Sequence, residues 1–66
     1  MNRRLKRKVR RAAFSSWRAN STLVDDERED AVLADLKAEY GDISEWIEII
    51  EFVMELIERL KELLAR

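Results

Sequence analysis

Residues 44–66, SEWIEIIEFVMELIERLKELLAR, form the most apolar stretch of this chain and decide its fold class. Large apolar side chains recur at alternating intervals of four and three residues, at Trp46, Ile50, Val53, Ile57, Leu60 and Leu64. This alternation is the a and d spacing of a coiled-coil helix, kept for nearly three heptads. The spacing predicts one long helix from about Asp42 to Ala65.

The positions that flank this seam are apolar as well. With Trp46 at d, the g positions are Ile49, Leu56 and Leu63, and the e positions include Ile47 and Met54. A two-stranded coiled coil usually carries charge at e and g, and a helix this apolar must be covered on more than one side. We therefore expect it to self-associate or to dock on a larger protein. The predicted interface comprises Trp46, Ile49, Ile50, Val53, Leu56, Ile57, Leu60, Leu63 and Leu64.

The segment before it, DDEREDAVLADLKAEYG at residues 25–41, predicts a shorter helix with Val32, Leu33, Leu36 and Tyr40 on its apolar face. Two capping boxes are expected, one from Asp26 with Glu29 and one from Asp42 with Glu45. Gly41, the only glycine, is expected in the left-handed conformation that ends a helix. The two helices would then form a hairpin with a tight corner at Gly41.

The chain begins MNRRLKRKVRR, in which seven of eleven residues are Lys or Arg. Leu5, Val9, Ala13 and Trp17 recur every fourth residue and predict a helix from about residue 2 to 19, followed by a bend at ANST, residues 19–22. Because the crowded charges repel one another, we expect this end to be poorly helical until a ligand neutralises it.

The formal charge of −1 hides two oppositely charged halves. Residues 1–24 carry eight bases and no acid, whereas residues 25–66 carry five bases and all fourteen acids. Such asymmetry suggests a basic arm for an anionic partner, and arginine's planar fork suits phosphate. The predicted nucleic-acid-binding residues are Arg3, Arg4, Lys6, Arg7, Lys8, Arg10, Arg11 and Arg18, with Phe14 and Trp17 as aromatic side chains that could stack on unpaired bases. The alternative for both aromatics is a place in the core.

Three other hypotheses compete for the basic segment. It could be a mitochondrial transit peptide, because it is rich in Arg and contains Ser but no acid. It could lie on an anionic membrane surface. It could also dock on an acidic protein surface, as in an adaptor, a scaffold or an inhibitor, for example an accessory protein of a virus.

A competing fold is a monomeric three-helix bundle, in which the first helix folds back over the other two.

The 66-residue chain has no cysteine and no histidine, which excludes disulfides, thiol nucleophiles and the commonest general base. The repeated E-x-x-E spacing of Glu45, Glu48 and Glu51 is interpreted as a solvated acidic face and not as a metal site. No cofactor, metal, catalytic activity or membrane span is expected.

The sequence predicts an all-α protein with a basic helix or arm at 1–22 and an acidic helical hairpin at 23–66. It would work in the cytoplasm or within a nucleoprotein or virion assembly.

Overall fold

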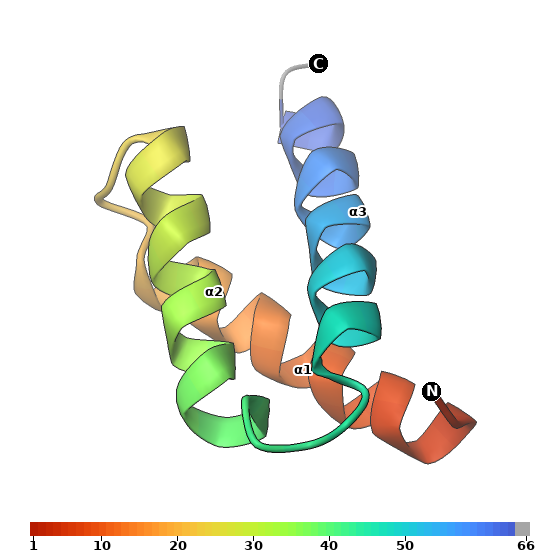
Figure 1. Ribbon diagram of the computed structural model, residues 1–66. Coiled ribbons are helices and arrows are strands. Elements are labelled where there is room, and N and C mark those ends of the chain that lie inside the picture. Colours follow the sequence, from red (N-terminus) through yellow and green to blue (C-terminus); the bar gives the residue numbers. More distant parts are fainter. Residues whose placement is uncertain (65–66) are drawn as a thin grey trace.

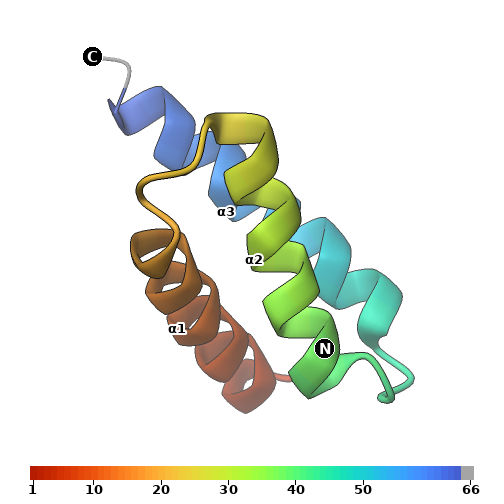
Figure 2. The same ribbon diagram turned by 90° about the vertical axis from the view of Figure 1, so that its left-hand side faces the viewer.

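A computed structural model describes residues 1–64, and these form three helices: α1 (Arg3–Ala19), α2 (Asp25–Tyr40) and α3 (Trp46–Leu64). The prediction of an all-α protein is confirmed. α2 and α3 run in opposite directions as a hairpin, and α1 crosses behind the end of the hairpin where α2 and α3 are joined (Figure 1). Seen from the side, α1 lies next to α2, and α3 lies behind α2 (Figure 2). Within residues 1–64, no helix is long and apolar enough to cross a membrane.

The basic segment is a continuous helix within one residue of the predicted bounds. Asn2 caps its start, because the Asn2 side-chain Oδ1 accepts a hydrogen bond from the Leu5 N–H at 2.8 Å. Its apolar stripe packs on the hairpin, with Val9 fully buried and Trp17 only 4% exposed. The expectation that charge repulsion would leave this end poorly helical is wrong for this structure, since tertiary packing supplies most of a helix's stability.

The start of α2 differs from the predicted capping box. The helix begins at Asp25, and its N-cap is Val24, whose side chain makes no capping hydrogen bond. Glu29 instead accepts a hydrogen bond from the Lys61 ammonium of α3 at 2.9 Å. The acids of the first turn still lie at the positive end of the helix dipole, which favours negative charge there.

The corner between α2 and α3 is longer than predicted and has a different geometry. Gly41 caps α2 with φ −63° and ψ −21°, so the expected left-handed conformation is wrong. α3 begins at Trp46 and not at Asp42. This position has no room for a side chain, because an added Cβ would lie 2.5 Å from the Lys37 carbonyl oxygen. Gly41 therefore permits a close approach of its own backbone to the Lys37 carbonyl of the preceding turn.

All three helices contribute to a single core. α1 supplies Val9, Ala13 and Trp17, α2 supplies Val32 and Leu36, and α3 supplies Ile49, Val53 and Ile57. The buried residues of α3 occupy g, d and a positions and face the chain's own helices. The structure is thus the three-helix arrangement that the sequence left as an alternative, and segments 1–22 and 23–66 share one core. The C-terminal end of the predicted third helix, Ala65, lies outside the described residues.

Candidate nucleic-acid interface

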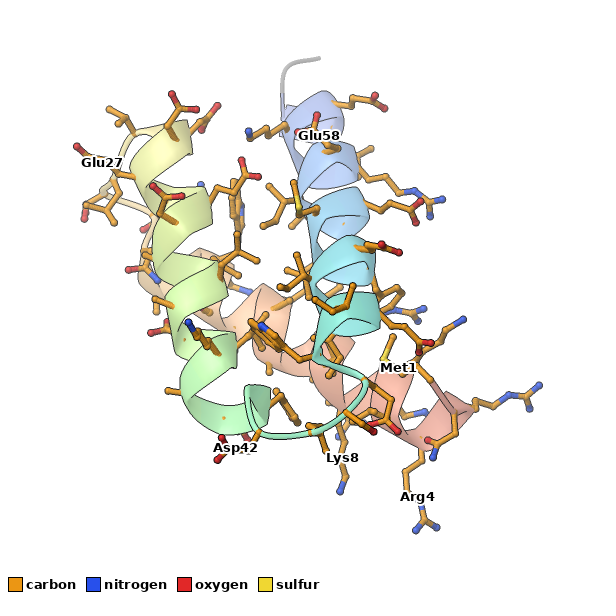
Figure 3. The ribbon with its side chains drawn as sticks, viewed as in Figure 1. Met1, Arg4, Lys8, Glu27, Asp42 and Glu58 are labelled. Carbon is orange, nitrogen blue, oxygen red and sulfur yellow. The ribbon has the colours of Figure 1, made fainter. Side chains whose placement is uncertain are left out.

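Six of the eight predicted cations lie on the side of α1 opposite the core. They are all exposed, and we call them the cationic face: Arg3, Arg4, Arg7, Lys8, Arg11 and Arg18. The helical repeat explains this arrangement, because Val9, Ala13 and Trp17 hold the opposite side of the helix against α2 and α3. Arg4 and Lys8 extend away from the hairpin (Figure 3).

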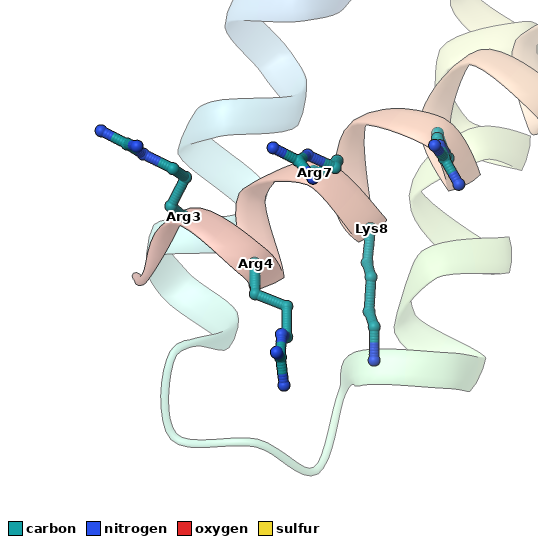
Figure 4. Close-up of a pocket in the computed structure, with 5 residues that line it drawn as sticks. Arg3, Arg4, Arg7 and Lys8 are labelled. Carbon is teal, nitrogen blue, oxygen red and sulfur yellow. The ribbon is translucent and has the colours of Figure 1, made fainter.

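The first two turns of the cationic face enclose a shallow depression of about 600 Å³. Its lining consists entirely of basic residues: Arg3, Arg4, Arg7, Lys8 and Arg11. Arg4 and Lys8 project side by side from the same side of α1 (Figure 4). Guanidinium groups present several N–H donors in a planar fork that matches phosphate oxygens. The depression therefore suits an anion with several oxygens more than it suits a neutral ligand.

Among the described residues, the charges of the cationic face have no ion-pair partner. Within residues 1–64 the ion pairs involve the N-terminal ammonium with Glu48, and Lys61 with Glu29 and Glu58. None of the six cations takes part in them, and α1 itself contains no acid. These donors are therefore available to an external anion.

The other two predicted cations lie elsewhere. The Lys6 ammonium and the Arg10 guanidinium sit 5.9 and 5.8 Å from the centre of the Phe52 ring of α3, within the range of a cation–π contact. Glu48 is nearby, and its pKa is lowered by a hydrogen bond from the N-terminal ammonium, by that group's charge and by the charge of Lys6. Lys6 and Arg10 thus contribute to the packing of α1 on α3, a role that the sequence did not reveal.

The two aromatic residues of α1 occupy opposite environments. Trp17 is in the core, and the Arg28 guanidinium of α2 lies 3.8 Å from its ring centre. Its indole Nε1 finds no hydrogen-bond partner among the described residues. Trp17 is thus positioned as a core anchor and has no open ring face for a base. Phe14 is half-buried in a second depression, lined by Arg11, Ser15 and Arg18, which continues the cationic face toward the end of α1.

Arg28 is a further residue that sequence reasoning missed. Its Nε–H donates a hydrogen bond to the Trp17 carbonyl oxygen at 2.8 Å, which satisfies one of the free carbonyls at the end of α1. Beside it, the Ser16 hydroxyl donates to the Asp35 carboxylate at 2.6 Å. These two contacts fix the end of α1 on α2 and so orient the cationic face. No local sequence pattern signals either of them.

The predicted interface on α3 divides between the interior and the surface. Ile49, Val53 and Ile57 are at most 1% exposed and belong to the chain's own core. Trp46, Leu56 and Leu60 are partly buried against that core, Ile50 is half-buried, and Leu63 is 61% exposed. The side chain of Leu64 lies outside the described residues. Ile47 and Met54, which the prediction omitted, are 67% and 44% exposed. Their apolar character at e positions was the available signal.

An acidic strip on α3 contrasts in charge with the cationic face of α1. Glu48, Glu51, Glu55, Glu58 and Glu62 are all exposed. A charge distribution of this kind would favour one orientation of approach for a polyanion.

Comparison with protein-family models, with curated proteins and with solved structures finds no match for the chain.

Proposed function

We propose that this protein binds the phosphate backbone of nucleic acid through the cationic face of α1, without sequence specificity and without catalysis. The observation that carries the proposal is the set of six exposed cations on one helix side, none of them paired with an acid within residues 1–64. Packing α1 on the hairpin holds these charges in a fixed array. A fixed array binds a polyanion at a lower entropic cost than a flexible arm does.

The dimensions of the face suit a polyanion. Arg3 and Arg18 are separated by fifteen residues of helix, which corresponds to about 22 Å at ~1.5 Å per residue. Duplex DNA carries one charge per ~1.7 Å of its axis, so several phosphates lie within that length. Neutralising phosphates releases condensed counterions, and this release drives binding independently of base sequence.

Salt dependence tests the proposal directly. If all six cations of the cationic face meet phosphates, the log–log slope of affinity against salt should be about −5 on duplex DNA. The Arg7→Gln, Arg11→Gln double variant should reduce the steepness of that slope by about two units and weaken unrelated sequences equally. The matched control is Lys37→Gln with Arg59→Gln, which removes the same charge from exposed positions of α2 and α3.

Fluorescence anisotropy with labelled duplexes would measure these slopes. If both double variants behave alike, net charge and not the cationic face governs binding. If the protein binds neither DNA nor RNA at low salt, the proposal fails. An adaptor, scaffold or inhibitor that docks the same face on an acidic protein would then explain the exposed cations.

Self-association is a second proposal, supported by the exposed side chains of Ile47, Met54 and Leu63 on α3. Ile47 and Met54, at e positions, share one side of α3, whereas Leu63, at a g position, lies on the other side of the seam. The exposed apolar surface is much smaller than the sequence predicted, because Ile49, Val53 and Ile57 are buried within the chain. We expect weak association between copies that light scattering detects at high concentration and that Ile47→Ser reduces without loss of helicity. A concentration-independent monomer would refute it. Ile57→Glu should instead unfold the chain, because it places a charge in the core.

A further inference from the structure

Phe14 is the one partly buried aromatic residue of α1 that has no place in the core. The partly buried apolar residues that pack against the core include Leu5 and Ala12 of the same helix but not Phe14. Its neighbours are instead Arg11, Ser15 and Arg18, with which it lines a depression of about 410 Å³. The ring is partly buried among exposed cations and not against the core, so packing of the core does not explain its position.

Phe14 differs from Trp17 and Phe52 in what lies over its ring. Arg28 lies over the Trp17 ring, and Lys6 and Arg10 lie over the Phe52 ring. Among the described residues, no Lys or Arg lies over the Phe14 ring at such a distance. The small side chain of Ser15 lies beside it in the same depression. Phe14 is thus the aromatic residue of α1 that lines a surface depression and that, among the described residues, has no cation over its ring.

From this arrangement we infer that Phe14 stacks on an unpaired base, so that the protein prefers single-stranded nucleic acid to duplex. The inference rests on the proposed function and specifies its ligand. Arg11 and Arg18 flank the ring along the helix and supply charge for the phosphates on either side of the stacked base. In a duplex, both faces of each base are already stacked on neighbouring bases, and the grooves present only base edges. The ring can therefore add affinity only for a strand whose bases are free.

Three ligands of equal length, each about 12 nucleotides, separate stacking from charge, since single-strand binding sites span ~4–16 nucleotides. They are an oligodeoxythymidine, an abasic single strand with the same phosphates, and a duplex. Phe14→Leu keeps an apolar side chain but removes the π face, whereas Phe14→Trp enlarges it. Circular dichroism would confirm that both variants keep the helical content of the unmodified chain.

We expect Phe14→Leu to weaken binding of the oligodeoxythymidine about 5- to 150-fold and to leave binding of the abasic strand and the duplex unchanged. Phe14→Trp should bind the oligodeoxythymidine at least as tightly as the unmodified chain does, with quenching of the introduced indole on binding. If Phe14→Leu changes all three affinities equally, or none of them, while binding remains salt-dependent, the stacking inference is wrong and the proposed function stands. If none of the three ligands binds at low salt, the proposed function fails first.

Discussion

Removing the Arg28 side chain should destabilise the fold, although local helix rules predict the opposite. Arg28 lies near the N-terminal end of α2, where the helix dipole disfavours a cation, and alanine is the better helix former. A helix considered alone would therefore gain stability from Arg28→Ala. In the folded chain, the same side chain bonds the Trp17 carbonyl oxygen at 2.8 Å and lies 3.8 Å from the Trp17 ring centre.

The expected loss can be estimated from these two contacts. A hydrogen bond from a charged donor is worth ~1.5–3 kcal/mol, and a partly desolvated cation–π contact adds ~0.5–2 kcal/mol. Ordering a long arginine side chain costs up to ~2 kcal/mol, which offsets part of this gain. A net loss of about 2 kcal/mol is therefore expected for Arg28→Ala. Arg28→Lys keeps the charge but not the planar Nε–H fork, so it should lose about half as much.

Urea unfolding followed by far-ultraviolet circular dichroism would measure these differences. For a domain of this size, a loss of 2 kcal/mol lowers the Tm by roughly 10 °C. Arg59→Ala is the matched control, because Arg59 is exposed on α3 and a surface change of this kind should stay within ~0.5 kcal/mol. An Arg28→Ala protein as stable as the unmodified chain, or more stable, would refute the idea that Arg28 holds α1 on α2.

Deleting residues 1–11 should abolish cooperative unfolding, because the deletion removes the fully buried Val9 and the partly buried Leu5. If circular dichroism shows that the shortened chain still melts cooperatively, the three helices do not depend on one shared core. Gly41→Ala should destabilise the fold by roughly 1 kcal/mol or more, because the alanine Cβ would meet the Lys37 carbonyl oxygen. At an unhindered helical site Gly→Ala raises the Tm, so a gain in Tm here would contradict that close approach. The pKa of Lys61 is raised, chiefly by its hydrogen bond to Glu29. The pair therefore stabilises the fold fully below the unfolded-state pKa of ~10.4, and it loses this contribution as the pH rises through the higher folded-state pKa. In pH titrations of the Tm, Glu29→Gln should therefore lower the Tm at neutral pH and flatten its alkaline decline, and an unchanged profile would count against the pair.

Local patterns in the sequence were sufficient to predict that the chain is helical and which residues of α1 and α2 face the core. The four-residue recurrence of Leu5, Val9, Ala13 and Trp17 predicted α1 to within one residue at its start and correctly at its end. Val32 and Leu36 were placed on the apolar face of α2, and both are buried. Such periods are local, because residues three and four apart share a side of the helix whatever covers it.

The capping of α2 and α3 was not predictable from the same local rules. The predicted capping boxes of α2 and α3 did not form, since α2 begins two residues earlier and α3 three residues later than their expected caps require. Glu29 is instead bonded to Lys61, thirty-two residues away. A side chain that can bond either its own helix end or a distant cation adopts the bond that the tertiary arrangement brings within reach.

The sequence by itself determined an all-α chain with opposite charge on its two halves and an apolar stripe on each helix. It did not determine what covers those stripes, because an apolar surface contains no information about whether its cover is the same chain or another copy. Only the tertiary structure decided that α1 covers α2 and α3. That packing buries Trp17, leaves Phe14 outside, and sets Lys6 and Arg10 against Phe52, apart from the six cations of the cationic face. The physical reason is that a helix has two sides, and closing the core on one side of α1 determines which side chains remain on the other.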